Sequence, residues 1–84
     1  MLRATVTGKV WATRKTEGLS GVPLLVTQTP EGTVCICADC VGAGEGEQVL
    51  IATGSAARLA VGKALPVDAA IIAILDPQPE GRIP

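Results

Sequence analysis

The first part of the chain alternates between apolar and polar positions with a period of two. Over residues 2–13 the small or apolar set is Leu2, Ala4, Val6, Gly8, Val10 and Ala12, and the intervening set is Arg3, Thr5, Thr7, Lys9, Trp11 and Thr13. This period is typical of a half-buried β-strand. Gly8 lies in its middle, where a glycine permits the bend with which a long strand turns the corner of a small barrel.

Four more strands are predicted, at residues 22–29, 33–41, 48–53 and 69–75, because these segments are rich in aliphatic residues and end at turns. Pro30-Glu31-Gly32 joins the first two in a hairpin. Ser55 is expected to be the N-cap of a short helix over 56–61, which Gly62 would end. The predicted fold is all-β: a small five-stranded OB-like antiparallel barrel with one short helix between strands four and five.

The last predicted strand differs from the first because residues 69–75, Ala-Ala-Ile-Ile-Ala-Ile-Leu, are apolar on both faces. A strand of this kind is covered on both sides. A barrel formed by 84 residues has only one interior. The outer face of this strand is therefore expected to meet another copy of the chain.

The amino-acid composition limits the kinds of function that the chain can have. The 84 residues include no histidine, tyrosine or phenylalanine, and 48% are apolar. One folded domain is expected, and catalysis by side chains is poorly supported because histidine is the usual general base near neutral pH. Seven basic and eight acidic residues give no electrostatic basis for binding nucleic acid. No membrane partner or secretion signal is expected, because no run approaches the roughly 20 apolar residues of a membrane span and Met1-Leu2-Arg3 leads into no apolar segment.

Three cysteines, Cys35, Cys37 and Cys40, lie within six residues. A disulfide framework uses dispersed, even-numbered cysteines, and a structural zinc site uses four ligands, whereas this chain supplies three and no histidine. The cysteines are therefore expected to be small buried hydrophobes, and no metal or cofactor is predicted. A metal or redox role would need cysteines from a second subunit. Free thiols are typical of a reducing, cytosolic environment.

Two glycine motifs invite a functional interpretation. Gly42-x-Gly44-x-Gly46 has neither the dinucleotide-binding spacing nor the Gly-Lys-Ser/Thr of a P-loop, and adjacent glutamates would repel phosphate. It predicts a turn that needs positive φ or close backbone approach. Gly54-Ser55 begins the predicted helix, whose N-terminus could attract anions, and it is also the dipeptide at which self-cleaving pyruvoyl-type barrels break.

In order along the chain, the motifs resemble the EutN/CcmL vertex proteins of bacterial microcompartments. The segments that carry the resemblance are Asp39-x-x-Gly42-Ala43-Gly44-x-Gly46-Glu47-x-Val49-Leu50, Gly54-Ser55-x-Ala57-Arg58, Pro66-x-Asp68, Ile72-x-Ile74-x-Asp76, Val6-x-Gly8-x-Val10-x-x-Thr13-x-Lys15 and Gly21-x-x-Leu24-Leu25. They cover about residues 2–76. The resemblance assigns residues 1–76 to a vertex domain and leaves residues 77–84 as a proline-bearing C-terminal tail, expected to be mobile.

The resemblance implies a structural protein without catalytic residues. It implies a cyclic homopentamer at the five-fold vertices of a microcompartment shell in the cytoplasm, with hexameric shell proteins as partners. The subunit interface is then expected at Gly42, Gly44, Gly46, Ile72 and Ile74, and the region near the axis at Gly54, Ser55 and Arg58. The compartment type stays open among carboxysome, ethanolamine, propanediol and glycyl-radical types.

Two other functions are compatible with the residues. One is an oligomeric OB-like module that binds a small anion or single-stranded nucleic acid, with Trp11 as a stacking platform, although Trp11 is better explained as part of a subunit contact. The other is an enzyme that uses Gly54-Ser55, with a lysine as the base.

Overall fold

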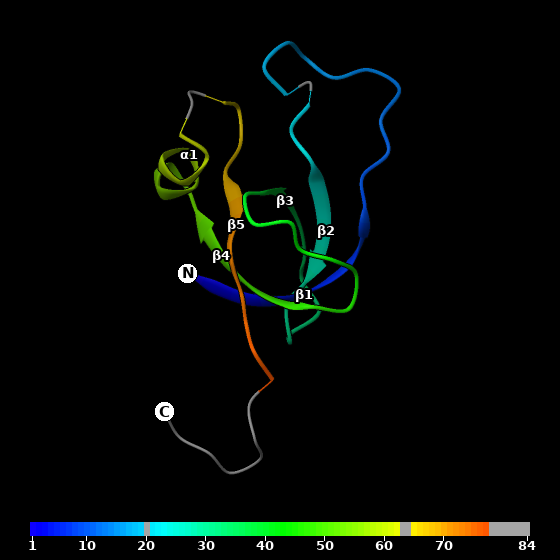
Figure 1. The fold of residues 1–84 in the computed structure, drawn as a ribbon, viewed down its shortest axis with the longest axis vertical. Helices are drawn as coiled ribbons and strands as arrows, with labels where there is room; N and C mark the ends of the chain where they lie inside the picture. The colour runs from blue at the N-terminus through cyan, green and yellow to red at the C-terminus, as the bar shows by residue number, and fades with distance from the viewer. Residues whose placement is uncertain (20, 63–64, 78–84) are drawn as a thin grey trace.

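The computed structural model describes residues 1–19, 21–62 and 65–77. Over these residues five strands form a closed barrel in the order β1-β2-β3-β5-β4, with helix α1 between β4 and β5 in the sequence (Figure 1). The elements are β1 (Leu2–Lys9), β2 (Leu24–Gln28), β3 (Val34–Asp39), β4 (Gln48–Thr53), α1 (Ser55–Val61) and β5 (Ala69–Ile74). The predicted barrel and the position of its helix are confirmed.

One strand pair differs from the expected antiparallel barrel. Four neighbouring pairs are antiparallel, but β3 and β5 run parallel, with Ala38 opposite Ala70 and Asp39 opposite Ile71. The chain between these two strands contains the glycine-rich loop, β4 and α1. A hairpin forces two strands to run antiparallel, but a connection this long does not. Parallel strands in fact require a long crossover connection between them.

The first strand is shorter than its alternation predicts. β1 ends at Lys9 rather than residue 13, and its register with β2 shifts between Val6 and Gly8, where a bend was expected. The Val10 amide still donates to the Leu24 carbonyl at 2.9 Å. Because β2 begins at Leu24, residues 11–13 have no strand opposite them. The other strands end within two residues of their predicted bounds.

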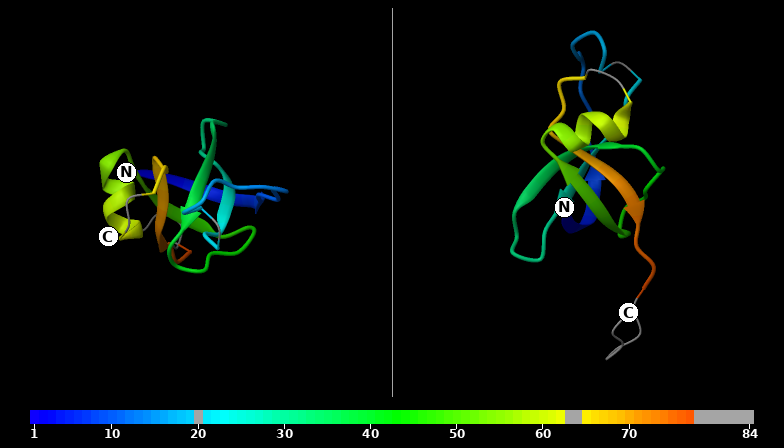
Figure 2. Two further views of the ribbon diagram at one scale, coloured as in Figure 1. Left: turned by 90° about the horizontal axis from the view of Figure 1, so that it is seen from above. Right: turned by 90° about the vertical axis from the view of Figure 1, so that its left-hand side faces the viewer.

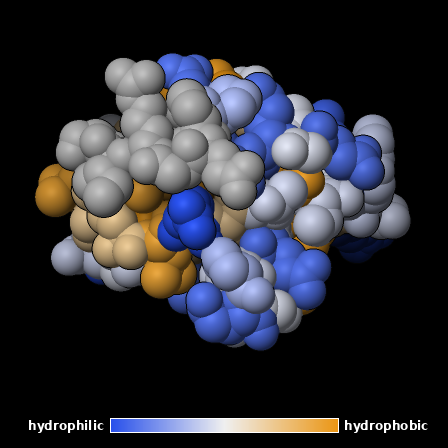
Figure 3. All heavy atoms as spheres, turned by 90° about the horizontal axis from the view of Figure 1, so that it is seen from below, coloured by the Kyte–Doolittle hydropathy of each residue, from blue (hydrophilic) through white to orange (hydrophobic). Residues whose placement is uncertain are grey.

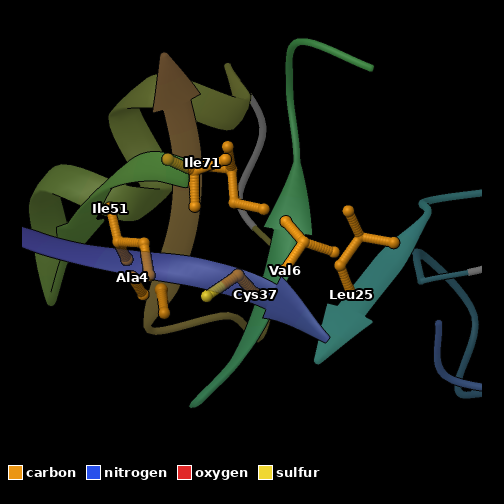
Figure 4. Packing of buried hydrophobic residues seen from close by; sticks show 8 residues of the cluster. Ala4, Val6, Leu25, Cys37, Ile51 and Ile71 are labelled. Carbon is orange, nitrogen blue, oxygen red and sulfur yellow. The ribbon is translucent and has the colours of Figure 1, made fainter. Parts of the chain in front are cut away.

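Every strand contributes to the main hydrophobic core. Its buried members are Ala4, Val6, Leu25, Cys37, Val49, Ile51, Ala69 and Ile71. In Figure 4 the labelled side chains come from opposite walls of the barrel and point toward one another. The alternation in β1 therefore identified the inward positions Ala4 and Val6 correctly.

A second, smaller core lies outside the barrel wall. Ala57 of α1 is fully buried against Ala38 and Ala70, which places the helix over the outer side of this wall (Figures 1 and 2). Part of the outer face of β5 is thus covered by the chain's own helix. Toward the end of the strand, Ile72 and Ala73 are half-buried and Ile74 is 38% exposed. Only this second half of β5 remains for contact with another copy.

Among the described residues, no helix is long and apolar enough to cross a membrane.

Candidate assembly surfaces

The glycine-rich loop after β3 is held by two carboxylates. One oxygen of Asp39 accepts hydrogen bonds from the amides of Val41 (3.1 Å), Gly42 (3.0 Å) and Ala43 (3.3 Å), and its second oxygen accepts from Ala43 at 3.0 Å. Glu47 accepts from the Gly44 amide at 2.6 Å. These amides already have an anionic partner within the chain, so the loop is not organised to hold a phosphate.

The loop glycines meet different backbone requirements. Gly42 and Gly46 have φ of 75° and 87°, in the left-handed region that favours glycine, as the sequence predicts. Gly44 is not in that region, but a Cβ there would lie 3.3 Å from a carboxylate oxygen of Glu47. The Gly46 amide donates to the Val6 carbonyl at 2.8 Å. The end of the loop therefore packs along β1 and continues into β4.

The end of β5 lies beside this loop. Ile74 is opposite Val49, Ala73 is opposite Leu50, and the register with β4 shifts between Leu50 and Ile51. A hollow of about 330 Å³ is lined by Gly46, Glu47, Gln48, Leu75, Asp76 and Pro77. The structure thus brings Gly46 and the segment that follows Ile74 to one surface. Figure 3, which views the molecule from below, shows hydrophobic surface directly beside strongly hydrophilic surface.

The three residues expected near the axis lie at the start of α1. Gly54, with φ 64°, is the N-cap, and its amide donates to the Asp68 carbonyl at 2.8 Å. The prediction of Ser55 as the N-cap is wrong, because Gly54 takes that position, Ser55 is the first helical residue, and no side chain caps the helix. Ser55 and Arg58 are both exposed. Gly62 ends the helix in the left-handed conformation, as predicted.

The two expected groups are not one site. Gly46 precedes β4 and Gly54 follows it, and a strand of six residues spans about 20 Å. Of the predicted interface, Gly46 and Ile74 therefore lie at the end of the β4–β5 pair opposite to the predicted axial residues, whereas Ile72 lies in the middle of β5 and Gly42 follows β3.

The cysteines divide by position. Cys37 is fully buried, 3.6 Å from the Thr27 hydroxyl, and Cys35 is half-buried against the same core. Burial raises the pKa of the Cys37 thiol, the charges of Cys35 and Asp68 add to this, and the hydrogen bond between Cys37 and Thr27 partly opposes it. The expectation of a buried side chain is wrong for Cys40, which is exposed because it follows the last residue of β3. Partial burial and the charge of Asp39 raise the pKa of Cys40.

The described residues contain no group of three or more histidine, cysteine, aspartate or glutamate side chains placed to hold a metal ion.

Two exposed apolar positions on β3 were not singled out from the sequence. Val34 and Ile36 are 60% and 46% exposed, while their neighbours Cys35 and Cys37 point into the barrel. In this strand the inward residues, Cys35 and Cys37, and the outward residues, Val34 and Ile36, are all apolar. The sequence therefore lacks the apolar–polar contrast that would have shown which two face outward. Trp11 is 85% exposed, and the Lys9 ammonium lies 5.2 Å from the centre of its ring.

Comparison with known proteins decides the family. The model of the family described as "Ethanolamine utilisation protein EutN/carboxysome" matches residues 1–76. The chain belongs to the EutN/CcmL family. It is 42% identical over 83 residues to the microcompartment shell vertex protein GrpN of Rhodospirillum rubrum, covering 90% of this chain and 93% of GrpN. It is 44% identical over 80 residues to the carboxysome shell vertex protein CcmL of Thermosynechococcus vestitus, covering 87% of this chain and 81% of CcmL.

Solved EutN/CcmL-family structures agree with this fold. GrpN of Rhodospirillum rubrum, described as a pentameric microcompartment shell protein, superposes with a TM-score of 0.81 at 38% identity, covering 92% of this chain and 95% of that one. The pentameric shell protein of the RMM microcompartment gives 0.85 at 42% identity and covers both chains completely. The resemblance inferred from the motifs is confirmed, and so is a structural rather than enzymatic role, because these relatives are named shell vertex proteins. The binding-module alternative finds no support among them.

Proposed function

We propose that this EutN/CcmL-family chain is a shell vertex protein, five copies of which form a closed ring at a five-fold corner of a bacterial microcompartment. The observation that supports this most directly is the family match over residues 1–76, together with solved relatives described as pentameric at 38% and 42% identity. Hexameric shell proteins would be the neighbours of the ring in the shell.

The role of such a ring is geometric. A sheet of six-fold tiles is flat and cannot close, whereas replacing a six-fold position by a five-fold one introduces curvature. The subunit must then be a rigid unit that repeats at a fixed angle to its neighbour. A closed barrel with a core from every strand meets this requirement, because close-packed interiors deform little.

A cyclic ring uses a heterologous interface, in which one surface of a subunit meets a different surface of the next. We place one side of this contact at Gly42, Gly44, Gly46, Ile72 and Ile74. Two features support the placement: the hollow shared by Gly46 and the segment after β5, and the exposed fraction of Ile74, which leaves apolar surface uncovered in the isolated subunit. Gly54, Ser55 and Arg58 are placed near the axis, where exposed side chains from five copies would converge.

Native mass spectrometry of the full chain tests the ring. The expected dominant species is the pentamer, and a dominant monomer, dimer or hexamer would overturn the proposal. In cells, deletion of the protein should leave shells that are open or elongated. Closed shells of normal shape in the deletion strain, with no second vertex protein present, would contradict the vertex role.

A further inference from the structure

The first part of β3 has a partner strand on only one side. Residues 34–38 pair with β2, from Val34 opposite Gln28 to Ala38 opposite Leu24. The parallel pairing with β5 begins only at Ala38. Over residues 34–37, therefore, the second edge of β3 faces no strand of the described part of the chain.

The hydrogen-bond alternation shows which backbone groups point to this edge. The Thr29 amide donates to the Thr33 carbonyl, and the Asp39 amide donates to the Pro23 carbonyl, each at 2.9 Å. In an antiparallel pair, hydrogen-bonded and non-bonded positions alternate. Cys35 and Cys37 therefore bond to β2, and the amide and carbonyl groups of Val34 and Ile36 point to the free edge.

The side chains of the same two residues form an apolar outer surface. Val34 is 60% and Ile36 is 46% exposed. Val26, opposite Ile36 on β2, is half-buried beside them. Next to Ile36 is a hollow of about 200 Å³, lined mostly by apolar residues that include Leu19, Leu24 and Val67. The edge thus offers backbone groups that pair with no strand of the described residues, and an apolar surface at the same place.

Nothing in the local sequence protects this edge. Native proteins blunt free edges with charged residues, prolines or bulges. Val34-Cys35-Ile36-Cys37 has none of these, and an uncharged segment with two β-branched residues is typical of strands that pair with other chains. A soluble protein that keeps such an edge is expected to cover it in its assembled form.

We propose that the β3 edge at Val34–Cys37 receives an extended segment of the adjacent copy in the ring, which adds a strand to the β2–β3 pair. This inference rests on the proposed function. It supplies the second surface that a heterologous contact requires. Gly46 and Ile74 of the first surface lie at the end of β5, whereas β3 meets β5 near its start, with Ala38 opposite Ala70, and residues 34–37 precede that point. The two surfaces therefore lie on different sides of the subunit, as a head-to-tail ring needs.

Residue-resolved amide exchange of the intact pentamer tests the proposal. The amides of Val34 and Ile36 should exchange at least about 100-fold more slowly than freely exposed amides, because each donates across the subunit boundary. An intact pentamer in which both amides exchange as fast as exposed loop amides would overturn the edge inference while leaving the ring standing. Absence of any pentamer would instead overturn the proposed function. Protection that appears only after hexameric shell protein is added would mean that the partner is not a second copy.

Two variants separate the backbone from the side chain. Val34→Pro removes an edge-pointing amide at the first residue of the strand, where proline is tolerated, and keeps the bonds to β2. Ile36→Lys places a charge on the exposed apolar surface. Each should raise the concentration at which the pentamer dissociates by about tenfold or more, with an unchanged circular dichroism spectrum of the subunit. The control Thr13→Lys, in an exposed loop, should dissociate like the wild type. Wild-type dissociation of both edge variants would overturn the inference.

Discussion

The amide of Ala43 donates to both carboxylate oxygens of Asp39, at 3.3 and 3.0 Å, so that one acidic side chain fixes the path of the chain as it leaves β3. The same carboxylate also accepts from Val41 and Gly42. The glycine-rich loop, which looks from its composition like a flexible connection, is therefore built around an internal anion.

Removal of this anion should loosen the loop before it unfolds the barrel. Hydrogen bonds to a charged group contribute about 1.5–3 kcal/mol, so Asp39→Ala should lower the free energy of unfolding by roughly 2–3 kcal/mol. Asp39→Asn keeps one acceptor oxygen and should lower it by about half as much. Chemical denaturation measures the loss, and limited proteolysis should cut the variants first between residues 40 and 47. Equal stability of Asp39→Ala and the wild type would show that these bonds contribute little.

The loop glycines should differ in what they tolerate. Gly42→Ala and Gly46→Ala meet no neighbouring atom within 4 Å but force alanine into positive φ, which costs about 1 kcal/mol or more. Gly8→Ala is the matched control, because it also has open space but no positive φ. If the loop lies at the subunit contact, the two loop variants should weaken the pentamer by more than they lower subunit stability. Thermal unfolding and native mass spectrometry together measure both effects.

Neighbouring isoleucines of β5 should separate folding from assembly. Ile71 is fully buried in the core, so Ile71→Asp should abolish folding, because a buried unpaired carboxylate is very costly. Ile74 is 38% exposed, so Ile74→Asp should leave a folded subunit that no longer forms the pentamer. Circular dichroism and size-exclusion chromatography with light scattering distinguish the two results. A fully pentameric Ile74→Asp protein would remove Ile74 from the proposed interface.

Arg58 tests the placement near the axis. Five copies would bring five positive charges together, and their repulsion would be screened by salt. The wild-type pentamer should therefore become more stable between low and moderate ionic strength, and Arg58→Gln should remove most of this dependence. Arg14→Gln, an exposed loop change of equal charge, is the control. The same salt response in Arg58→Gln and the wild type would place Arg58 away from the axis.

Burial of the Cys37 thiol predicts a loss of stability at alkaline pH. The folded protein holds this pKa above its ordinary value, mainly through desolvation. Below the ordinary thiol pKa both states keep the proton, whereas above it the unfolded state ionises first and is favoured. The free energy of unfolding should therefore fall as pH rises beyond the ordinary thiol range. Cys37→Ala should be less stable near neutral pH but should show a shallower alkaline decline, measured by urea denaturation from pH 7 to 10. An identical decline in both proteins would assign it to other groups.

Much of the fold could be predicted because local patterns report local constraints. Alternation in residues 2–9 identified the inward residues Ala4 and Val6, and the positive φ of Gly42, Gly46 and Gly62 followed from glycine's conformational freedom. The prediction of the N-cap of α1 failed because a contact between segments far apart in the sequence fixes the backbone there. The Asp68 carbonyl, distant in sequence, accepts from the Gly54 amide, and Gly54 rather than Ser55 takes the N-cap position.

The sequence by itself determined the strand content, the barrel class and the family, because periodicity and glycine positions are properties of neighbouring residues. Only the tertiary structure decided which apolar faces are left uncovered. α1 folds back over Ala70 and covers part of the outer face of β5, which the sequence suggested would need a second copy. The parallel pairing of β3 with β5 begins only at Ala38, so that at Val34 and Ile36 the edge of β3 away from β2 faces no strand of the described residues. Both outcomes depend on how elements far apart in the chain meet, and no local pattern records that.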